Sequence, residues 1–209
     1  MPESRITGFI VSLPVFLLAI TLHEVGHAYV AYLCGDDTAK RAGRLTLSPI
    51  AHLDPLGTLL FVVSSLAGGI GFGWAKPVPV AVGRMRNPRR DDILVSLAGV
   101  TANLLQAIAW SLLLRAAEAY LSGSFGAAVA TLCFIGVVMN VVLMIFNLLP
   151  IPPLDGSHVA LNLLGIHNPY TIMQFSRIGM LVLFLFVSTG IFGAFFGAIV
   201  EPVIRLFLR

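Results

Sequence analysis

Charged residues are scarce in this 209-residue chain, at 11% of the total, whereas a soluble globular domain carries about 25%. Hydrophobic residues make up 57%, and the mean hydropathy is +0.93. No polar tract of about 50 residues is present, so the sequence leaves no room for a separate soluble domain. The composition predicts an all-α polytopic membrane protein, with residues 1–209 in a single membrane-embedded domain.

Cysteine is almost absent as well. The two cysteines, Cys34 and Cys133, show no CxxC spacing and give no sign of a disulfide framework or a zinc knuckle. The net charge is +3. In so apolar a chain, an excess of basic residues is typical of the cytoplasmic ends of spans and not of a nucleic-acid surface. We therefore expect a lipid bilayer around the chain and no nucleic-acid partner.

Four apolar runs are long enough to cross about 30 Å of hydrocarbon as helices. They are Ile6 to Leu33, Ile93 to Leu114, Phe125 to Leu149 and Ile178 to Val200. The first run is too long for the core of a signal peptide, and no small-residue cleavage site precedes its polar residues. We therefore expect it to remain as a span of the mature protein.

A fifth apolar run, Gly57 to Phe72, is shorter and rich in glycine, and the extended-looking KPVPV at 76–80 follows it. It predicts either a fifth span or a re-entrant or β-hairpin segment around 57–82. Re-entry is favoured because it keeps all the basic residues between Cys34 and Asp92 on one side, as the positive-inside rule requires. These are Lys40, Arg41, Arg44, Lys76, Arg84, Arg86, Arg89 and Arg90. Irregular backbone at membrane depth must line a cavity, which an intramembrane site needs.

The motif HEVGH lies inside the first span. Residues four apart share one face of a helix, so His23 and His27 can bind one metal ion, with Glu24 beside them. Zinc in such a site needs a third protein ligand and an open position for water, whose proton Glu24 would take. The alternative is a chance motif whose histidines are hydrogen-bonded in a core. Two histidines and a glutamate are costly in a span, by roughly 2–3 kcal/mol or more for a charge at its centre, which favours the metal site.

Asp155 is the best candidate for the third ligand. It follows Pro150, Pro152 and Pro153, which end the preceding helix and extend the chain, and no positive charge lies near it in the sequence. An Asp after prolines is also a common helix N-cap. The spacing alone does not choose between these two uses.

Three motifs in this order resemble the site-2 protease family of intramembrane metalloproteases, peptidase family M50. They are HEVGH at 23–27, GVTAN at 99–103 and NLLPIPPLDG at 147–156. GWAKPVPV followed by NPRRD resembles the short bacterial or archaeal form, without PDZ or CBS domains. The resemblance implies that His23, His27 and Asp155 hold one Zn2+ per chain, with no other cofactor, and that Glu24 is the general base.

The resemblance also implies a role for two asparagines. Asn147 would lie near the zinc and donate to the substrate carbonyl or the developing oxyanion, which makes it a catalytic and substrate-binding candidate. Asn103 is a second substrate-binding candidate. For each the alternative is a buried interhelical hydrogen bond, which we favour for Asn103, with Gly99 permitting close helix approach.

The substrate implied by the resemblance is a transmembrane protein, cut near the cytoplasmic face of the cell membrane. The active site of this multi-pass chain should then face the cytoplasmic side. An exposed strand edge at 76–80 could pair with an extended substrate, although a simple lid or packing hairpin is an equal alternative.

Competing functions can be separated on the sequence. A metal-ion transporter should show ionisable residues along a path through several spans, and a catalytically silent relative that only binds membrane helices could easily lose Glu24. A zincin of another kind would need a third ligand such as Glu118 or Glu201, which sit near span ends. His52 and Asp54 more simply form a turn than a second metal site. The predicted function is therefore an intramembrane zinc metalloendopeptidase.

Overall fold

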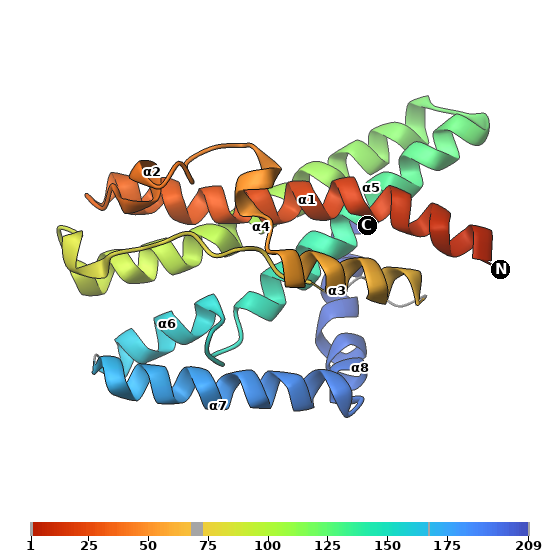
Figure 1. The fold of residues 1–209 in the computed structure, drawn as a ribbon. Coiled ribbons are helices and arrows are strands. Elements are labelled where there is room, and N and C mark those ends of the chain that lie inside the picture. The colour runs from red at the N-terminus through yellow and green to blue at the C-terminus, as the bar shows by residue number, and fades with distance from the viewer. Residues whose placement is uncertain (1, 68–72, 167, 209) are drawn as a thin grey trace.

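The computed structural model describes residues 2–67, 73–166 and 168–208. Within these ranges the chain is helical and contains no strand ladder, which confirms the all-α prediction (Figure 1). The elements are α1 (Pro2–Leu33), α2 (Thr38–Arg41), η1 (Pro49–His52), α3 (Pro55–Leu66), η2 (Val82–Arg84), α4 (Pro88–Tyr120), α5 (Gly123–Asn147), α6 (Asp155–Leu163), α7 (Pro169–Ser188), α8 (Ile191–Phe195), the π-type turn η3 (Phe196–Val200) and α9 (Glu201–Leu208).

Three long helices form the centre of the molecule. Helix α4 packs along both α1 and α5, and α1 also contacts α5. The segments Ile6–Leu33, Pro88–Tyr120 and Gly123–Asn147 are each long and apolar enough to cross a membrane, which confirms the first three predicted spans. The chain is therefore a multi-pass membrane protein.

The predicted fourth span, Ile178 to Val200, is wrong as a single helix. Helix α7 ends at Ser188, and Gly190 adopts a left-handed conformation with φ of 76° before α8 begins. The fourth helical stretch that is long and apolar enough to cross is instead Ile191–Leu208. Hydropathy does not reveal the boundary between α7 and α8, because the whole run is apolar. Only Gly190, a residue type that tolerates positive φ, marks the turn.

The segment around 57–82 is a helix followed by an extended segment. The Asp54 side chain accepts a hydrogen bond from the Gly57 N–H at 2.8 Å, and Pro55 begins α3. This cap starts a helix within the segment, so the β-hairpin alternative is wrong for the described residues. The only pairing recorded for them is an isolated antiparallel bridge between Leu53 and Ala75.

The chain returns beside its point of entry. A Cβ atom at Gly73 would stand 2.5 Å from the Gly57 carbonyl oxygen, so the two glycines are in contact. The 12 residues of α3 span about 18 Å, short of the roughly 30 Å of a bilayer core. This geometry supports re-entry over crossing; residues 68–72, part of the predicted run, lie outside the described residues.

His52 and Asp54 have structural roles in this region. His52 is fully buried, and its Nε2 contacts the Thr46 carbonyl at 2.9 Å. Asp54 caps α3 as described above. Neither belongs to a cluster of potential metal ligands among the described residues, in agreement with the turn interpretation.

Gly57→Ala should lower the stability of the protein. The new Cβ would stand 2.3 Å from the Trp74 carbonyl oxygen, and overpacking of this kind costs about 1–3 kcal/mol. We expect a lower thermal midpoint in detergent, followed by circular dichroism. Gly193→Ala is the matched control, because a Cβ there meets nothing within 4 Å. Equal midpoints for the two variants would argue against the close return of the chain.

Candidate metal centre

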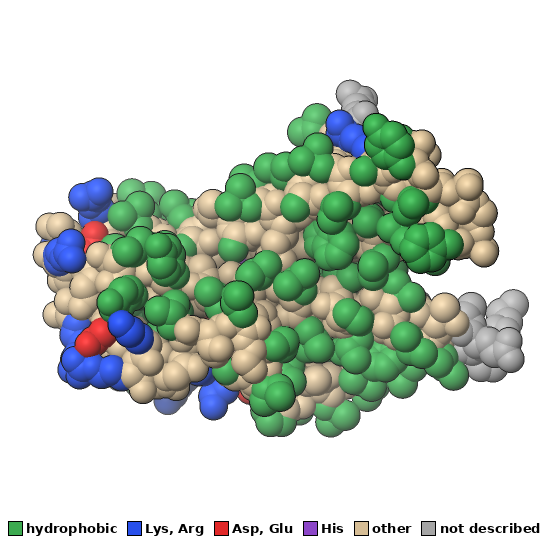
Figure 2. All heavy atoms as spheres, turned by 90° about the horizontal axis from the view of Figure 1, so that it is seen from above, with side chains coloured by type: hydrophobic (Ala, Val, Ile, Leu, Met, Phe, Trp, Pro, Cys, Tyr) green, Lys and Arg blue, Asp and Glu red, His purple; other side chains and the backbone are tan. Residues whose placement is uncertain are grey.

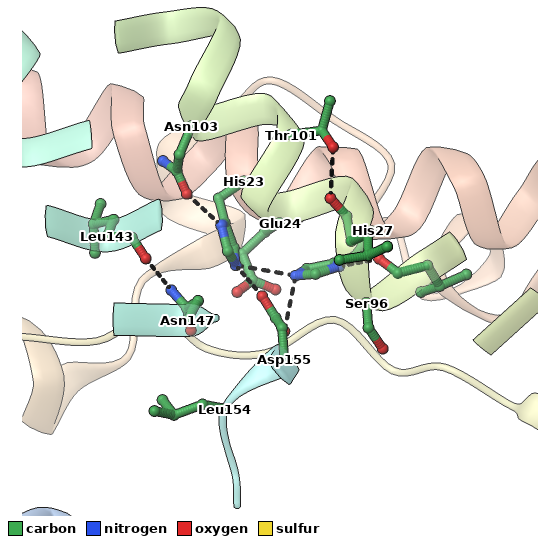
Figure 3. Close-up of polar contacts among 12 residues, drawn as sticks. His23, Glu24, His27, Ser96, Thr101, Asn103, Leu143, Asn147, Leu154 and Asp155 are labelled. Atoms are coloured by element: carbon green, nitrogen blue, oxygen red, sulfur yellow. Dashed lines mark hydrogen bonds and ion pairs between the residues drawn. The ribbon is translucent and has the colours of Figure 1, made fainter. Parts of the chain in front are cut away.

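Helix α1 supplies the first part of the site. His23, Glu24 and His27 are 8%, 7% and 7% exposed, although all three lie in a helix with the composition of a membrane span. The two imidazoles project from the same face of α1, as their spacing predicts (Figure 3). Buried polar groups in such a helix need partners, and the partners come from α4, from α6 and from the extended segment before α4.

Asp155 completes a triangle of potential ligand atoms. Its Oδ2 lies 3.3 Å from His23 Nε2 and its Oδ1 lies 3.4 Å from His27 Nε2, while the two Nε2 atoms are 3.0 Å apart. Ligand atoms at about 2.0–2.1 Å from a tetrahedral zinc ion are about 3.3–3.4 Å apart. The two nitrogen–oxygen distances match this spacing, each to a different oxygen of Asp155, and the nitrogen–nitrogen distance is shorter. Among the described residues, this is the only group of three such side chains close enough to hold a metal.

The protonation of the two imidazoles suits a cation. His27 Nδ1 lies 2.7 Å from the Val95 carbonyl oxygen, which can only accept, so Nδ1 carries the proton. His23 Nδ1 lies 2.6 Å from Asn103 Oδ1, also an acceptor. Neutral rings held in this way turn two Nε2 lone pairs towards each other, and their 3.0 Å contact is then not a hydrogen bond.

The carboxylate of Asp155 gives an independent test of the fit. Its Oδ2 atom is buried and has no hydrogen-bond partner. An unpartnered carboxylate oxygen beside two imidazole lone pairs is unfavourable unless a cation joins them. The donor set of two imidazole nitrogens and one carboxylate is the chemistry that zinc binds in hydrolytic sites. The residues present therefore fit a zinc ion.

The turn after α5 places Asp155. Helix α5 ends at Asn147, and Asp155 is the first residue of α6, where Leu154 occupies the cap position without a side-chain cap. The N-cap alternative for Asp155 is thus not realised, because its carboxylate points to the histidines instead. Gly156 packs against the end of α5, because a Cβ there would stand 2.2 Å from the Leu148 carbonyl oxygen.

Helix α6 is held against α4 by a polar cluster. The Asn162 side chain donates to the Asp92 carboxylate, and His158 Nδ1 lies 3.8 Å from the same group. The Asp92 carboxylate raises the pKa of His158 above its ordinary value, although burial acts in the opposite direction. These contacts fix the helix that carries Asp155, so they help to set the position of its carboxylate.

Gly99 on α4 lets this helix pass directly behind the imidazoles. A Cβ at this position would stand 2.4 Å from His27 Nε2 and 2.6 Å from His23 Cε1. No side chain larger than hydrogen fits there without moving the rings. Close helix approach at Gly99 is therefore confirmed, and the neighbour that demands it is the histidine pair itself.

Glu24 is bound to an extended segment, residues 74–81, which we call the strap (Figure 1). Its Oε2 accepts the Val78 N–H at 2.8 Å. The strap is anchored at both ends, since Arg44 donates to the Lys76 carbonyl at 2.5 Å and Asp36 accepts the Ala81 N–H at 2.6 Å. The strap therefore lies over the site and uses the carboxylate of Glu24 as one of its anchors.

Electrostatics at the Asp36 anchor agree with this arrangement. Burial acts to raise the pKa of Asp36, but hydrogen bonds from Thr38 and the Ala81 N–H outweigh it and leave the pKa below its ordinary value. Asp36 is thus a charged anchor for the strap.

The two asparagine candidates lie in different surroundings. Asn103 is fully buried, with Oδ1 at His23 and Nδ2 at Asn140 Oδ1, which favours the packing role of the two left open. Asn147 is partly buried at the end of α5 and donates to the Leu143 carbonyl at 3.0 Å. Figure 3 shows Asn147 on the side of the site opposite α4, near Asp155.

Sequence reasoning missed Asn140 and Val78. Asn140 is the last residue of GVVMN at 136–140, which repeats the G-x-x-x-N spacing of GVTAN. That repetition is a signal that could have identified it. Val78 acts through its backbone N–H, and no side-chain pattern reveals such a contact.

Comparisons with known proteins agree with this geometry. The model of a family described as peptidase family M50 matches residues 11–189. The "Putative zinc metalloprotease YwhC" of Bacillus subtilis is 46% identical over 146 residues, which are 68% of this chain and 64% of that relative. The "Putative zinc metalloprotease Rip2" of Mycobacterium tuberculosis H37Rv is 35% identical over 199 residues, which are 91% of this chain and 72% of that relative.

The Rip2 relative in Mycolicibacterium smegmatis is 35% identical over 156 residues. The matched segment covers 64% of the Bacillus relative and 58% of this one, less than two thirds of either protein. No solved structure matches the chain.

Gly99→Ala should weaken metal binding. The added methyl group would displace both imidazoles, and we expect zinc affinity to fall by about tenfold or more, in the range seen when the support of a ligand is lost. Zinc per purified chain, measured against a competing chelator, checks this. Gly83→Ala is the control, because a Cβ at Gly83 meets nothing within 4 Å. Full zinc affinity in Gly99→Ala would count against the observed packing of α4 on the histidines.

Proposed function

The chain belongs to peptidase family M50, and from this premise we propose that it is a membrane-embedded zinc metalloendopeptidase whose metal is held by His23, His27 and Asp155. The observation that carries the proposal is the convergence of two buried imidazole nitrogens on the Asp155 carboxylate, with N–O distances of 3.3 and 3.4 Å and an N–N distance of 3.0 Å. Three protein ligands leave one tetrahedral position open, as in catalytic rather than structural zinc sites.

Each residue then has a chemical task. A zinc ion held by His23, His27 and Asp155 would supply Lewis acidity and would lower the pKa of a water molecule to about 7. Glu24, next to His23 on α1, takes the proton of the attacking water and returns it to the amine that leaves. Its present bond to the Val78 N–H holds the carboxylate in one orientation. The low exposure of His23, Glu24 and His27 keeps bulk water away from the reaction.

Asn147 is the proposed oxyanion donor. It ends α5, eight positions before Asp155. Its amide now donates to the Leu143 carbonyl, and a change of side-chain rotamer would release it from this bond. A donor preorganised towards the developing oxyanion is worth about 3–4 kcal/mol of transition-state stabilisation in other proteases. Asn103, in contrast, is engaged by His23 and Asn140, and we assign it to positioning.

The proposed substrate is an extended segment at the end of a transmembrane helix. The N–H groups of Lys76 and Val78 both bond inward, to the His52 carbonyl and to Glu24. Pro77 and Pro79 are exposed and have no N–H, so the outer edge of the strap offers carbonyl acceptors and no donor at these residues. A substrate strand would bind this edge by donating its own N–H groups; a lid that only covers the site is the alternative.

The proposed orientation places the site near the cytoplasmic face. Figure 2 shows most of the visible Lys and Arg side chains gathered at one end of the molecule, with apolar side chains over the rest of this face. Helix α1 ends at Leu33, six residues or about 9 Å beyond His27, and Lys40 and Arg41 follow in α2. The positive-inside rule assigns this end to the cytoplasm.

A metal-ion transporter is the weaker proposal. Helix α5, which forms one side of the central helix group, has no Asp, Glu, Lys, Arg or His along its 25 positions. Buried histidines and carboxylates lie instead near the end of the molecule where α1 ends and α4 begins. A catalytically silent relative would need Glu24 only for its bond to the Val78 N–H and not as a base beside the ligand residues.

Glu24→Gln should abolish cleavage without loss of zinc. Removal of the general base should lower the rate by about 10²-fold or more, because the amide cannot accept the proton. The measurement is cleavage of a model transmembrane substrate in detergent, with zinc per chain determined on the same sample. Glu118→Gln, at an exposed position near the end of α4, is the matched control and should cleave normally. Normal cleavage by Glu24→Gln would disprove the mechanism.

Asp155→Ala should remove the third ligand and with it most of the zinc. Two imidazoles alone form an incomplete site, so we expect zinc per chain to fall from one to near zero after dialysis against a chelator. Asp37→Ala, which removes a carboxylate paired with Arg41, should retain its zinc. Retention of full zinc by Asp155→Ala would place the third ligand elsewhere.

A further inference from the structure

Two fully buried amides meet in the centre of the three-helix group. Asn103 on α4 and Asn140 on α5 are both 0% exposed, and Asn103 Nδ2 donates to Asn140 Oδ1 at 2.9 Å. Amides in apolar helices are costly unless all their groups find partners. Asn103 contacts His23, and Asn140 donates to the Gly136 carbonyl of α5. The pair therefore connects the metal centre to a helix that supplies no ligand.

The hydrogen bonds run from His23 through Asn103 and Asn140 to the Gly136 carbonyl, and this last group determines the direction of each bond. The Gly136 carbonyl can only accept, so the group facing it at 3.0 Å is Asn140 Nδ2, and Asn140 turns Oδ1 towards Asn103. Asn103 must then donate through Nδ2 and present Oδ1 to His23 Nδ1 at 2.6 Å. The Ala19 carbonyl, 3.5 Å from Asn103 Nδ2, agrees with this orientation.

The orientation of Asn103 decides which nitrogen of His23 is free. Because Oδ1 accepts, His23 Nδ1 keeps its proton and Nε2 keeps its lone pair towards Asp155 and His27. A flipped Asn103 amide would present an N–H group instead. The proton of His23 would then move to Nε2, which could no longer bind a metal.

We propose that Asn140 is a positioning residue for the metal centre: it locks the amide of Asn103 and thereby the ring and tautomer of His23. This inference rests on the proposed zinc site. Asn140 touches neither substrate nor metal and acts only through Asn103. The outer partners of metal ligands typically change affinity by 10- to 100-fold when removed, and Asn140 extends this support by one residue.

Close packing of α5 on α4 explains how Asn140 can contact Asn103. Gly136 lies against Trp110 of α4, and a Cβ there would stand 2.4 Å from the indole ring. The close approach brings Asn140, one helical turn later, to Asn103. His27 has a different support, because its Nδ1 bonds the Val95 carbonyl, which cannot flip. Only the His23 side of the site therefore depends on Asn140.

The alternative is that Asn140 only joins two helices, as buried amides often do. Gln106 provides the matched control. It is another buried amide on α4, it donates to the same Ala19 carbonyl at 3.4 Å, and it has no contact with His23 among those recorded for it. Loss of Gln106 should disturb helix packing without any effect on the tautomer of His23.

The test is zinc affinity in detergent, measured by competition with a chelator for the full chain. Asn140→Leu should bind zinc 10- to 100-fold more weakly than wild type, and Gln106→Leu should equal wild type. Asn140→Asp should restore affinity to within a few-fold of wild type, because a carboxyl oxygen still accepts from Asn103. Asn140→Ser, which is too short to reach Asn103, serves as the second disrupting variant if Asn140→Leu does not fold.

A double-mutant cycle separates positioning from simple packing. If Asn140 acts through Asn103, the variant with both Asn103→Leu and Asn140→Leu should bind zinc no more weakly than Asn103→Leu alone. Cobalt-loaded Asn140→Leu should also show an altered visible spectrum, while cobalt-loaded Gln106→Leu should not. Additive losses, unchanged affinity in both disrupting variants, or equal losses in Gln106→Leu would overturn the inference.

The same measurements distinguish failure of this inference from failure of the proposed function. Wild type without zinc, or His23→Ala with full zinc affinity, would remove the zinc site itself. Normal zinc binding by wild type, lost in His23→Ala but kept in Asn140→Leu and Asn140→Ser, would leave the zinc site in place and refute only the role of Asn140.

Discussion

Two imidazole lone pairs and a carboxylate face one another at 3.0 to 3.4 Å inside an apolar helix group, and only a cation makes this arrangement favourable. Much of the surrounding structure serves the same constraint. Gly99 leaves space for the rings, the Val95 carbonyl and the Asn103 amide hold their Nδ1 protons, and the turn after α5 delivers Asp155. The site thus draws on three separated parts of the chain, although only three side chains are proposed as ligands.

Most features that depend on neighbouring residues were predicted correctly, whereas most features that depend on residues far apart in the sequence were not. His23 and His27 share a face because of helix geometry alone, so their pairing was predictable from their spacing. Asp155 could not be assigned on spacing, since a ligand and an N-cap were equally compatible with it, and the family resemblance chose between them. The first three spans were also predictable, because each is a long apolar run with clear ends.

The predictions failed where a local signal competed with hydropathy. Gly190 divides the last apolar region, and the Asp54 cap begins helix α3 in a segment for which a β-hairpin was one alternative. Asn140 and the Val78 N–H escaped notice for a different reason. Their partners lie 37 and 54 positions away, so the contacts depend on how helices pack and not on any local pattern. The anchors of the strap escaped notice for the same reason, because nothing in the local sequence distinguishes Asp36 and Arg44 from other charged residues in loops.

The strap links the metal centre to the question of substrate access. It occupies Glu24 through one backbone N–H, and its outer edge presents carbonyl groups at two exposed prolines. A substrate that binds this edge is placed beside the general base without competing for the same N–H. The re-entrant geometry of α3 and the strap thereby gives a membrane protein an irregular, hydrogen-bonded backbone segment next to its proposed catalytic residues.

The central claim is that zinc is bound by two imidazoles and one carboxylate with one position left for water. X-ray absorption spectroscopy at the zinc edge of the purified wild-type protein tests it most directly. The account predicts four nitrogen or oxygen neighbours at about 2.0–2.1 Å, with multiple scattering from two imidazole rings. A sulfur neighbour at about 2.3 Å, or scattering from no imidazole, would contradict it.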